Sequence, residues 1–260
     1  MARRIRSFIN MLALLPIVFI LACSGASQPP AEQAKPAEPA APAVDVAEHM
    51  HEHLARVTTM QEAVVRGDLE AAIEPAKWIA DHQETQGLPA GSETFVSDMK
   101  KQAGAVAIAA GAHDLKNTAV ATAMTISYCG TCHAAAKVTP QMMEPVQLPV
   151  SSVARAHMLE HLRATDLLYQ GLVMPSEQRW QKGLDAMQGS PLAEKDLPKD
   201  TKLTKEIVAL EAKVHGLAAK AKTATDLGTK VAFYGEYLAG CAGCHGLHGK
   251  IWGPGLQTAQ

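Results

Sequence analysis

Apolar side chains recur along the chain with the spacing of amphipathic helices. One stripe advances by steps of 3, 4, 3 and 4 residues: Met50, His53, Val57, Met60 and Val64. A second stripe lies 108 residues later with the same steps: Met158, His161, Thr165, Leu168 and Leu172. Such steps place all members on one helix face and are typical of helices that pack in a bundle. Each predicted core face therefore contains one histidine.

Helix breakers and periodicity predict four helices in each half. In the first half, helices are expected over residues 47–66, 69–83, 93–113 and 118–138. Gly67–Asp68 should separate the first two, and Pro75 should kink the second or lie near its start. In the second half, the first helix should end near Met174, residues 190–200 should form a loop, and Gly246 should end the last helix.

The two halves resemble each other in the order of their motifs. The pattern His-Met-x-Glu-His-Leu occupies residues 49–54 and again 157–162, and each half closes on Cys-x-x-Cys-His. A repeat of this length is too long for a solenoid unit and fits two small domains. The sequence thus predicts an all-α chain with two tandem four-helix-bundle domains. The expected boundaries are residues 45–140 and 153–250, with a linker at 141–152 and a tail at 251–260.

The N-terminus has the pattern of an export signal. Arg3, Arg4 and Arg6 precede an apolar run over residues 8–22. This run is shorter than the roughly 20 residues of a membrane-spanning helix, so residues 1–22 are predicted to be a signal peptide.

Cys23 follows the apolar run directly, as in the lipobox of bacterial lipoproteins. Cys23 is therefore the expected lipidation site. Residues 23–44 are rich in proline and alanine and are expected to form an extended tether. Together these features predict a bacterial envelope protein, lipid-anchored on the periplasmic side. By analogy, Ser24 favours the outer membrane.

Composition narrows the possible partners. Of the 260 residues, 47% are hydrophobic and 4% aromatic, and the net charge is −2. Abundant alanine with few aromatic residues favours helices over a sheet. Because lysine and arginine form no cluster outside the N-terminus, nucleic acid is not an expected partner.

The two Cys-x-x-Cys-His motifs admit three chemistries. Structural zinc usually takes two close ligand pairs, whereas these pairs lie 112 residues apart. A redox dithiol favours a βαβ context, which the helical pattern lacks. Covalent haem c uses both thiols for attachment and the histidine as an iron ligand, and the helical spacing puts all three on one side. Two haems are therefore expected, on Cys129, Cys132 and His133, and on Cys241, Cys244 and His245.

The second axial ligand is expected on the first helix of each half. The last helices carry inward stripes that end on the motifs: Ala119, Thr122, Ile126, Cys129 and His133, then Val231, Tyr234, Leu238, Cys241 and His245. Neutral imidazole is a good iron ligand, so His53 and His161 are the predicted distal ligands. The alternatives are Met50 and Met158, His49 and His157, or an open site.

Other polar residues near these positions receive lesser roles. Glu52 and Glu160 are candidates for orienting a ligand, although a solvated helix face is the simpler interpretation. Four histidines have no counterpart in the other half and are expected at surface or filler positions: His82, His113, His215 and His248.

The segment from Ala103 to Lys137 resembles the C-terminal part of the cytochrome c′ group of class II c-type cytochromes. It contains an alanine-rich helix, a short break, and a helix with Ser-x-Cys-x-x-Cys-His. By architecture the resemblance covers residues 46–138 and 153–246. It implies four-helix haem units. Family members are single domains, usually dimeric, with methionine or an open site distally, whereas this chain is a tandem with histidine near that place.

The combined features predict a di-haem c-type cytochrome that transfers electrons and is not an enzyme. Bis-histidine ligation, lipid attachment to the membrane and unidentified redox partner proteins are expected. The alternatives are a gas-binding or sensing haem protein and a peroxidase-like enzyme with one open iron site. In a peroxidase-like enzyme, one haem would feed electrons to the open catalytic iron of the other. The near-symmetry of the halves argues against such different roles for the two haems.

Overall fold

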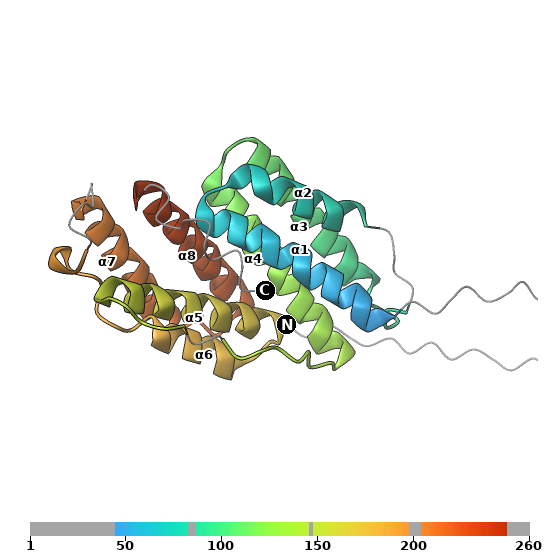
Figure 1. Ribbon diagram of the computed structural model, residues 1–260. Helices are drawn as coiled ribbons and strands as arrows, with labels where there is room; N and C mark the ends of the chain where they lie inside the picture. The colour runs from blue at the N-terminus through green and yellow to red at the C-terminus, as the bar shows by residue number, and fades with distance from the viewer. Residues whose placement is uncertain (1–44, 83–86, 146–147, 198–203, 249–260) are drawn as a thin grey trace, which may run out of the picture. The chain divides into compact units, whose positions relative to one another are not determined.

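The computed structural model describes residues 45–82, 87–145, 148–197 and 204–248, which contain eight α-helices and no strand (Figure 1). The predicted signal peptide, Cys23, the tether and the tail at 251–260 lie outside these residues. The helices of the first half are α1 (Val46–Arg66), α2 (Leu69–Asp81), α3 (Glu93–Gly111) and α4 (Leu115–Ala136). Those of the second half are α5 (Val153–Val173), α6 (Glu177–Ala186), α7 (Thr204–Ala221) and α8 (Leu227–His248). The predicted all-α class is confirmed.

Helix ends follow local sequence signals. Gly67 has φ 71° and caps the C-terminus of α1, so the predicted break before α2 is confirmed. Asp114 and Asp226 occupy equivalent places before α4 and α8. Their carboxylates accept hydrogen bonds from the backbone amides of Asn117 (3.1 Å) and Thr229 (2.8 Å). The repeat therefore extends to the helix caps.

Three details differ from or refine the sequence predictions. Pro75 lies inside α2 and is buried, rather than near its start. The loop at 190–200 contains a short 3-10 turn at Glu194–Asp196. The last helix continues past Gly246 to His248, so the predicted stop was wrong. A single glycine costs a helix only about 1 kcal/mol relative to alanine, which neighbouring turns offset.

In α1 and α5, the stripe positions that follow the histidine are buried, whereas the methionine and the histidine before them are only partly buried. Val57, Met60 and Val64 of α1 are buried, as are Leu168 and Leu172 of α5. The main hydrophobic cluster draws buried side chains from both halves, and the described residues from 45 to 248 belong to one compact unit. The division into two separate four-helix domains stays a prediction.

The halves meet in a two-fold pattern. α4 packs against α8, while α1 contacts α8 and its counterpart α5 contacts α4 (Figure 1). Glycines allow close approach: a Cβ on Gly130 would lie 1.9 Å from the carbonyl oxygen of Leu172. Deeper in the core, the Tyr234 hydroxyl of α8 donates a hydrogen bond of 2.9 Å to Oε1 of Gln61 in α1. Both motif-bearing helices therefore contact the other half.

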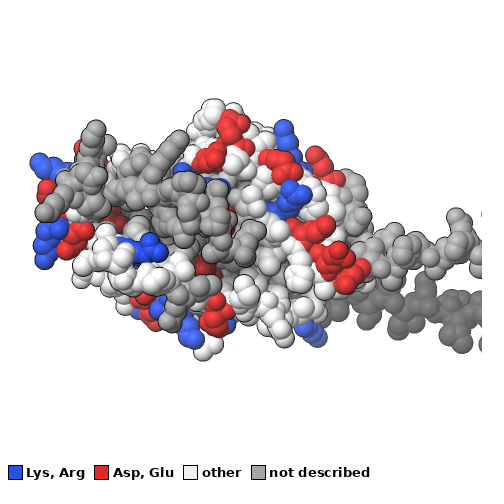
Figure 2. All heavy atoms as spheres, in the orientation of Figure 1, with Lys and Arg blue, Asp and Glu red and all other residues white. Residues whose placement is uncertain are grey.

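Acidic and basic side chains are interspersed on the face drawn in Figure 2. In the part of the chain that the structure describes, no helix combines the length and apolar character needed to cross a membrane.

Candidate functional site

Both Cys-x-x-Cys-His motifs lie in the last turns of long helices. The motif of α4 contains Cys129, and that of α8 contains Cys241, at the inward ends of the buried stripes. All four motif cysteines are partly buried and form no disulfide. Burial, and then the neighbouring motif cysteine, raises the pKa of Cys129 and of Cys241 to about 12. These two thiols stay protonated at neutral pH, unlike the thiolates of a reactive dithiol.

The cysteines do not gather into a metal site. Among the described residues, two groups of side chains could hold an ion, and neither includes a cysteine. A structural zinc site needs four converging ligands. The arrangement therefore does not favour the zinc interpretation of the motifs.

The two motif histidines bond across the halves in the same way. Nδ1 of His133 lies 2.9 Å from the carbonyl oxygen of Val173 in α5, and Nδ1 of His245 lies 2.7 Å from that of Val65 in α1. Val65 and Val173 are 108 residues apart, the offset of the two helices. Since a carbonyl only accepts, Nδ1 carries the proton in both rings. In the neutral ring Nε2 is then unprotonated, the form that binds a metal.

The predicted distal residue of the first half lies in a histidine cluster. His49 and His53 of α1 have ring centroids 4.6 Å apart, and Nε2 of His82 lies 3.4 Å from Nδ1 of His49. Trp78 stacks on His82 at 4.1 Å. Nε2 of His53 is buried without a hydrogen-bond partner. Burial, followed by the charges of His49, His82 and Lys100, lowers the pKa of His53 to about 4. His53 is therefore neutral at pH 7.

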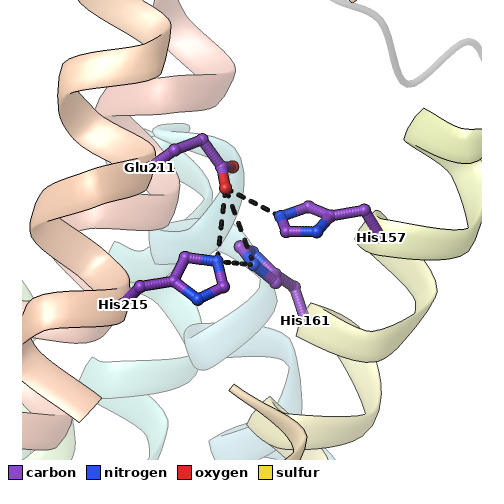
Figure 3. A group of neighbouring side chains, drawn as sticks. All are labelled: His157, His161, Glu211 and His215. Carbon is purple, nitrogen blue, oxygen red and sulfur yellow. Dashed lines mark hydrogen bonds and ion pairs between the residues drawn. The ribbon is translucent and has the colours of Figure 1, made fainter. Parts of the chain in front are cut away.

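The second half has a cluster with a carboxylate (Figure 3). Nε2 of His157 lies 2.7 Å from Oε2 of Glu211, and Nε2 of His215 lies 3.4 Å from the same oxygen. Nε2 of His161 lies 3.3 Å from Nε2 of His215 and 3.9 Å from Oε2 of Glu211. Three ring nitrogens and one carboxylate oxygen therefore point to a common centre.

The charges in this second cluster are unevenly distributed. Burial lowers the pKa of His161 to about 3, despite the opposing charge of Glu211. Burial alone would raise the pKa of Glu211, but hydrogen bonds from His157 and His215 outweigh it, and the pKa lies well below its usual range. The Glu211 side chain is ionised with only 3% of its surface exposed.

The second cluster lies near the motif of α8. The charge of His245 contributes to the lowered pKa of His161. The charge of Glu211 contributes, after burial, to raising the pKa of Cys244 to about 11. In the first half, the charges that lower the pKa of His53 come from His49, His82 and Lys100.

Several sequence predictions change in this light. His82 and His215 were expected at surface or filler positions, but both join a cluster, and the side chain of His215 is 8% exposed. His113 is exposed as expected. Glu52 and Glu160 lie on a solvated face. Glu211 was not predicted. Its four-residue spacing from His215, matching that of His157 and His161, was the available signal.

No family model, curated protein or solved structure shows significant similarity to this chain.

Proposed function

We propose that the chain is a di-haem c-type cytochrome that transfers single electrons. The observation that carries this proposal is the pair of Cys-x-x-Cys-His motifs whose histidines each donate Nδ1–H to a carbonyl of the other half. This bond fixes the ring and leaves Nε2 as the nitrogen for iron, as is usual for metal-ligating histidines.

The residues of the motifs suit covalent haem. Cys129 and Cys132 would hold one haem by thioether bonds and Cys241 and Cys244 the other, with His133 and His245 as proximal ligands. When bound, each haem supplies a one-electron iron couple. The protein holds the group and limits water around it, since the stripes leading to both motifs are buried.

On the distal side, His53 and His161 are the proposed ligands. The buried Nε2 of His53 lacks a hydrogen-bond partner, which costs free energy unless another group binds there. His161 is placed differently, because its Nε2 already lies near His215 and Glu211. That observation favours a second candidate function, in which the second iron is open distally and binds a diatomic gas.

Export, lipid attachment through Cys23 and redox partner proteins belong to the same proposal. They rest on residues 1–44, which lie outside the described part of the chain.

Mass spectrometry of the full chain, produced with a haem c maturation system, tests the attachment. We expect two covalent haems in the wild type and one in the Cys241→Ala/Cys244→Ala variant. The exposed His113→Ala variant should keep both. A wild-type chain without covalent haem would contradict the proposal. Carbon monoxide added to the reduced protein separates the two functions: an unchanged low-spin spectrum supports electron transfer, and rapid binding at one haem supports gas binding.

A further inference from the structure

We propose that His157, His161, Glu211 and His215 form a binding site for one divalent transition-metal ion, for which zinc is the probe. This site lies outside the two Cys-x-x-Cys-His motifs and shares only His161 with the proposed haem ligands. The inference does not rest on the proposed function.

Two of the distances among the four donor atoms match those of a tetrahedral site. Zinc bonds of about 2.0–2.1 Å in a tetrahedron place neighbouring ligand atoms about 3.3 Å apart. The His161–His215 and His215–Glu211 distances are 3.3 and 3.4 Å, and the His161–Glu211 distance is 3.9 Å. The fourth, between His157 and Glu211, is 2.7 Å, so an ion would widen this hydrogen bond by about 0.6 Å. All four donor atoms lie within 4.8 Å of one another.

Two helices supply the donors in matched pairs. His157 and His161 are four residues apart on α5, and Glu211 and His215 are four residues apart on α7. This spacing puts each pair on one helix face, and the two faces meet in Figure 3. Regular helices hold ligands in place better than loops do.

The buried carboxylate provides a second argument. The Glu211 side chain is only 3% exposed, and its ion-pair partners in the described residues are histidines rather than lysine or arginine. Buried charges are normally paired or coordinate a metal. A divalent cation at the common centre would neutralise Glu211 and use the three imidazoles as neutral ligands.

The first half lacks the equivalent carboxylate. At the 112-residue offset, Glu211 corresponds to Met99 and His215 to Ala103, and both side chains are buried. The first-half cluster of His49, His53 and His82 offers three nitrogens and no negative charge. The first-half cluster therefore serves as a comparison for the proposed site, because it has the histidines but not the carboxylate.

Equilibrium dialysis of the full chain against zinc, followed by elemental analysis, tests the inference. We expect one zinc per chain held by this site. The zinc affinity should fall by more than about 100-fold in His215→Ala and in Glu211→Gln. That loss exceeds the one usually seen when the replaced residue only hydrogen-bonds to a metal ligand. Because Glu211→Gln keeps the shape of the side chain, it tests the site even if His215→Ala fails to fold. His113→Ala, at an exposed histidine, and His82→Ala, in the first half, should bind zinc as the wild type does.

Two further measurements decide the result. Zinc should raise the melting temperature of the wild type and not that of Glu211→Gln, because an ion that binds only the folded chain stabilises it. Cys241→Ala/Cys244→Ala should still bind zinc, which separates this inference from the haem proposal. No zinc at stoichiometric concentration, or loss of zinc in His82→Ala but not in His215→Ala, would overturn it.

Discussion

The carbonyl oxygen of Val65 accepts a 2.7 Å hydrogen bond from Nδ1 of His245, which lies 180 residues further along the chain. The equivalent bond from His133 reaches Val173. Each half therefore positions a histidine of the other. Substitutions that move α1 or α5 should change the environment of a motif on α8 or α4.

Gly130→Ala should destabilise the contact between α4 and α5. The added Cβ would lie 1.9 Å from the carbonyl oxygen of Leu172, next to the acceptor of His133. We expect a loss of about 1–3 kcal/mol in the free energy of unfolding, measured by urea denaturation. Gly104→Ala in α3 is the matched control, since its Cβ meets only Ala80 at 3.9 Å. It should stabilise by about 0.5–1 kcal/mol. An unchanged urea midpoint for Gly130→Ala would contradict the close approach.

His53→Ala should open one iron of the haem-loaded chain. If His53 is the distal ligand, its loss leaves a five-coordinate iron that binds carbon monoxide after reduction. The measurement is the fraction of haem whose absorption changes with carbon monoxide. His51→Ala, two residues away on an exposed face, should leave the spectrum unchanged. Identical spectra for His53→Ala and the wild type would rule out His53 as the ligand.

Asp166→Asn should stabilise the protein above pH 6. Burial, and then the charge of Glu62, raises the pKa of Asp166 from 3.8 to about 6. The folded chain thus holds this proton more tightly than the unfolded chain, so stability falls as pH rises from about 4 to about 6 and stays lower above. Removing the charge should restore up to about 3 kcal/mol at pH 8 and little at pH 4.

Urea midpoints at the two pH values measure this effect, with Glu52→Gln at an exposed position as control. A gain of equal size at pH 4 and pH 8 would show that titration of Asp166 is not its cause.

Zinc should make the second iron accessible if both proposals hold. Nε2 of His161 can bind one metal at a time, so an ion held with His215 and Glu211 withdraws it from the iron. We expect a larger carbon monoxide-binding fraction in the reduced wild type when zinc is present, and no zinc effect in His215→Ala. If saturating zinc does not change the fraction of haem that binds carbon monoxide, zinc and the second iron do not compete for His161.

Local features of the fold were predictable because they depend on neighbouring residues. Steps of three and four placed Val57 and Leu168 in the core, and Gly67 ended α1 as expected. The role of Glu211 was not predictable in this way, since it depends on which face of α7 meets α5. The bonds of His133 and His245 likewise depend on how the halves pack. The haem interpretation of the motifs stays a prediction from sequence.

Each half supplies the carbonyl that accepts a hydrogen bond from a motif histidine of the other half. The two subunits of an isologous homodimer contact each other in the same reciprocal way, but here both halves belong to one polypeptide. A fragment that stopped before α5 would keep the first Cys-x-x-Cys-His motif but lose the acceptor for its histidine. Another copy of the fragment could replace that acceptor with the carbonyl of its own Val65. Covalent linkage of the halves makes this completion independent of protein concentration, although each half carries its own, different cluster of histidines.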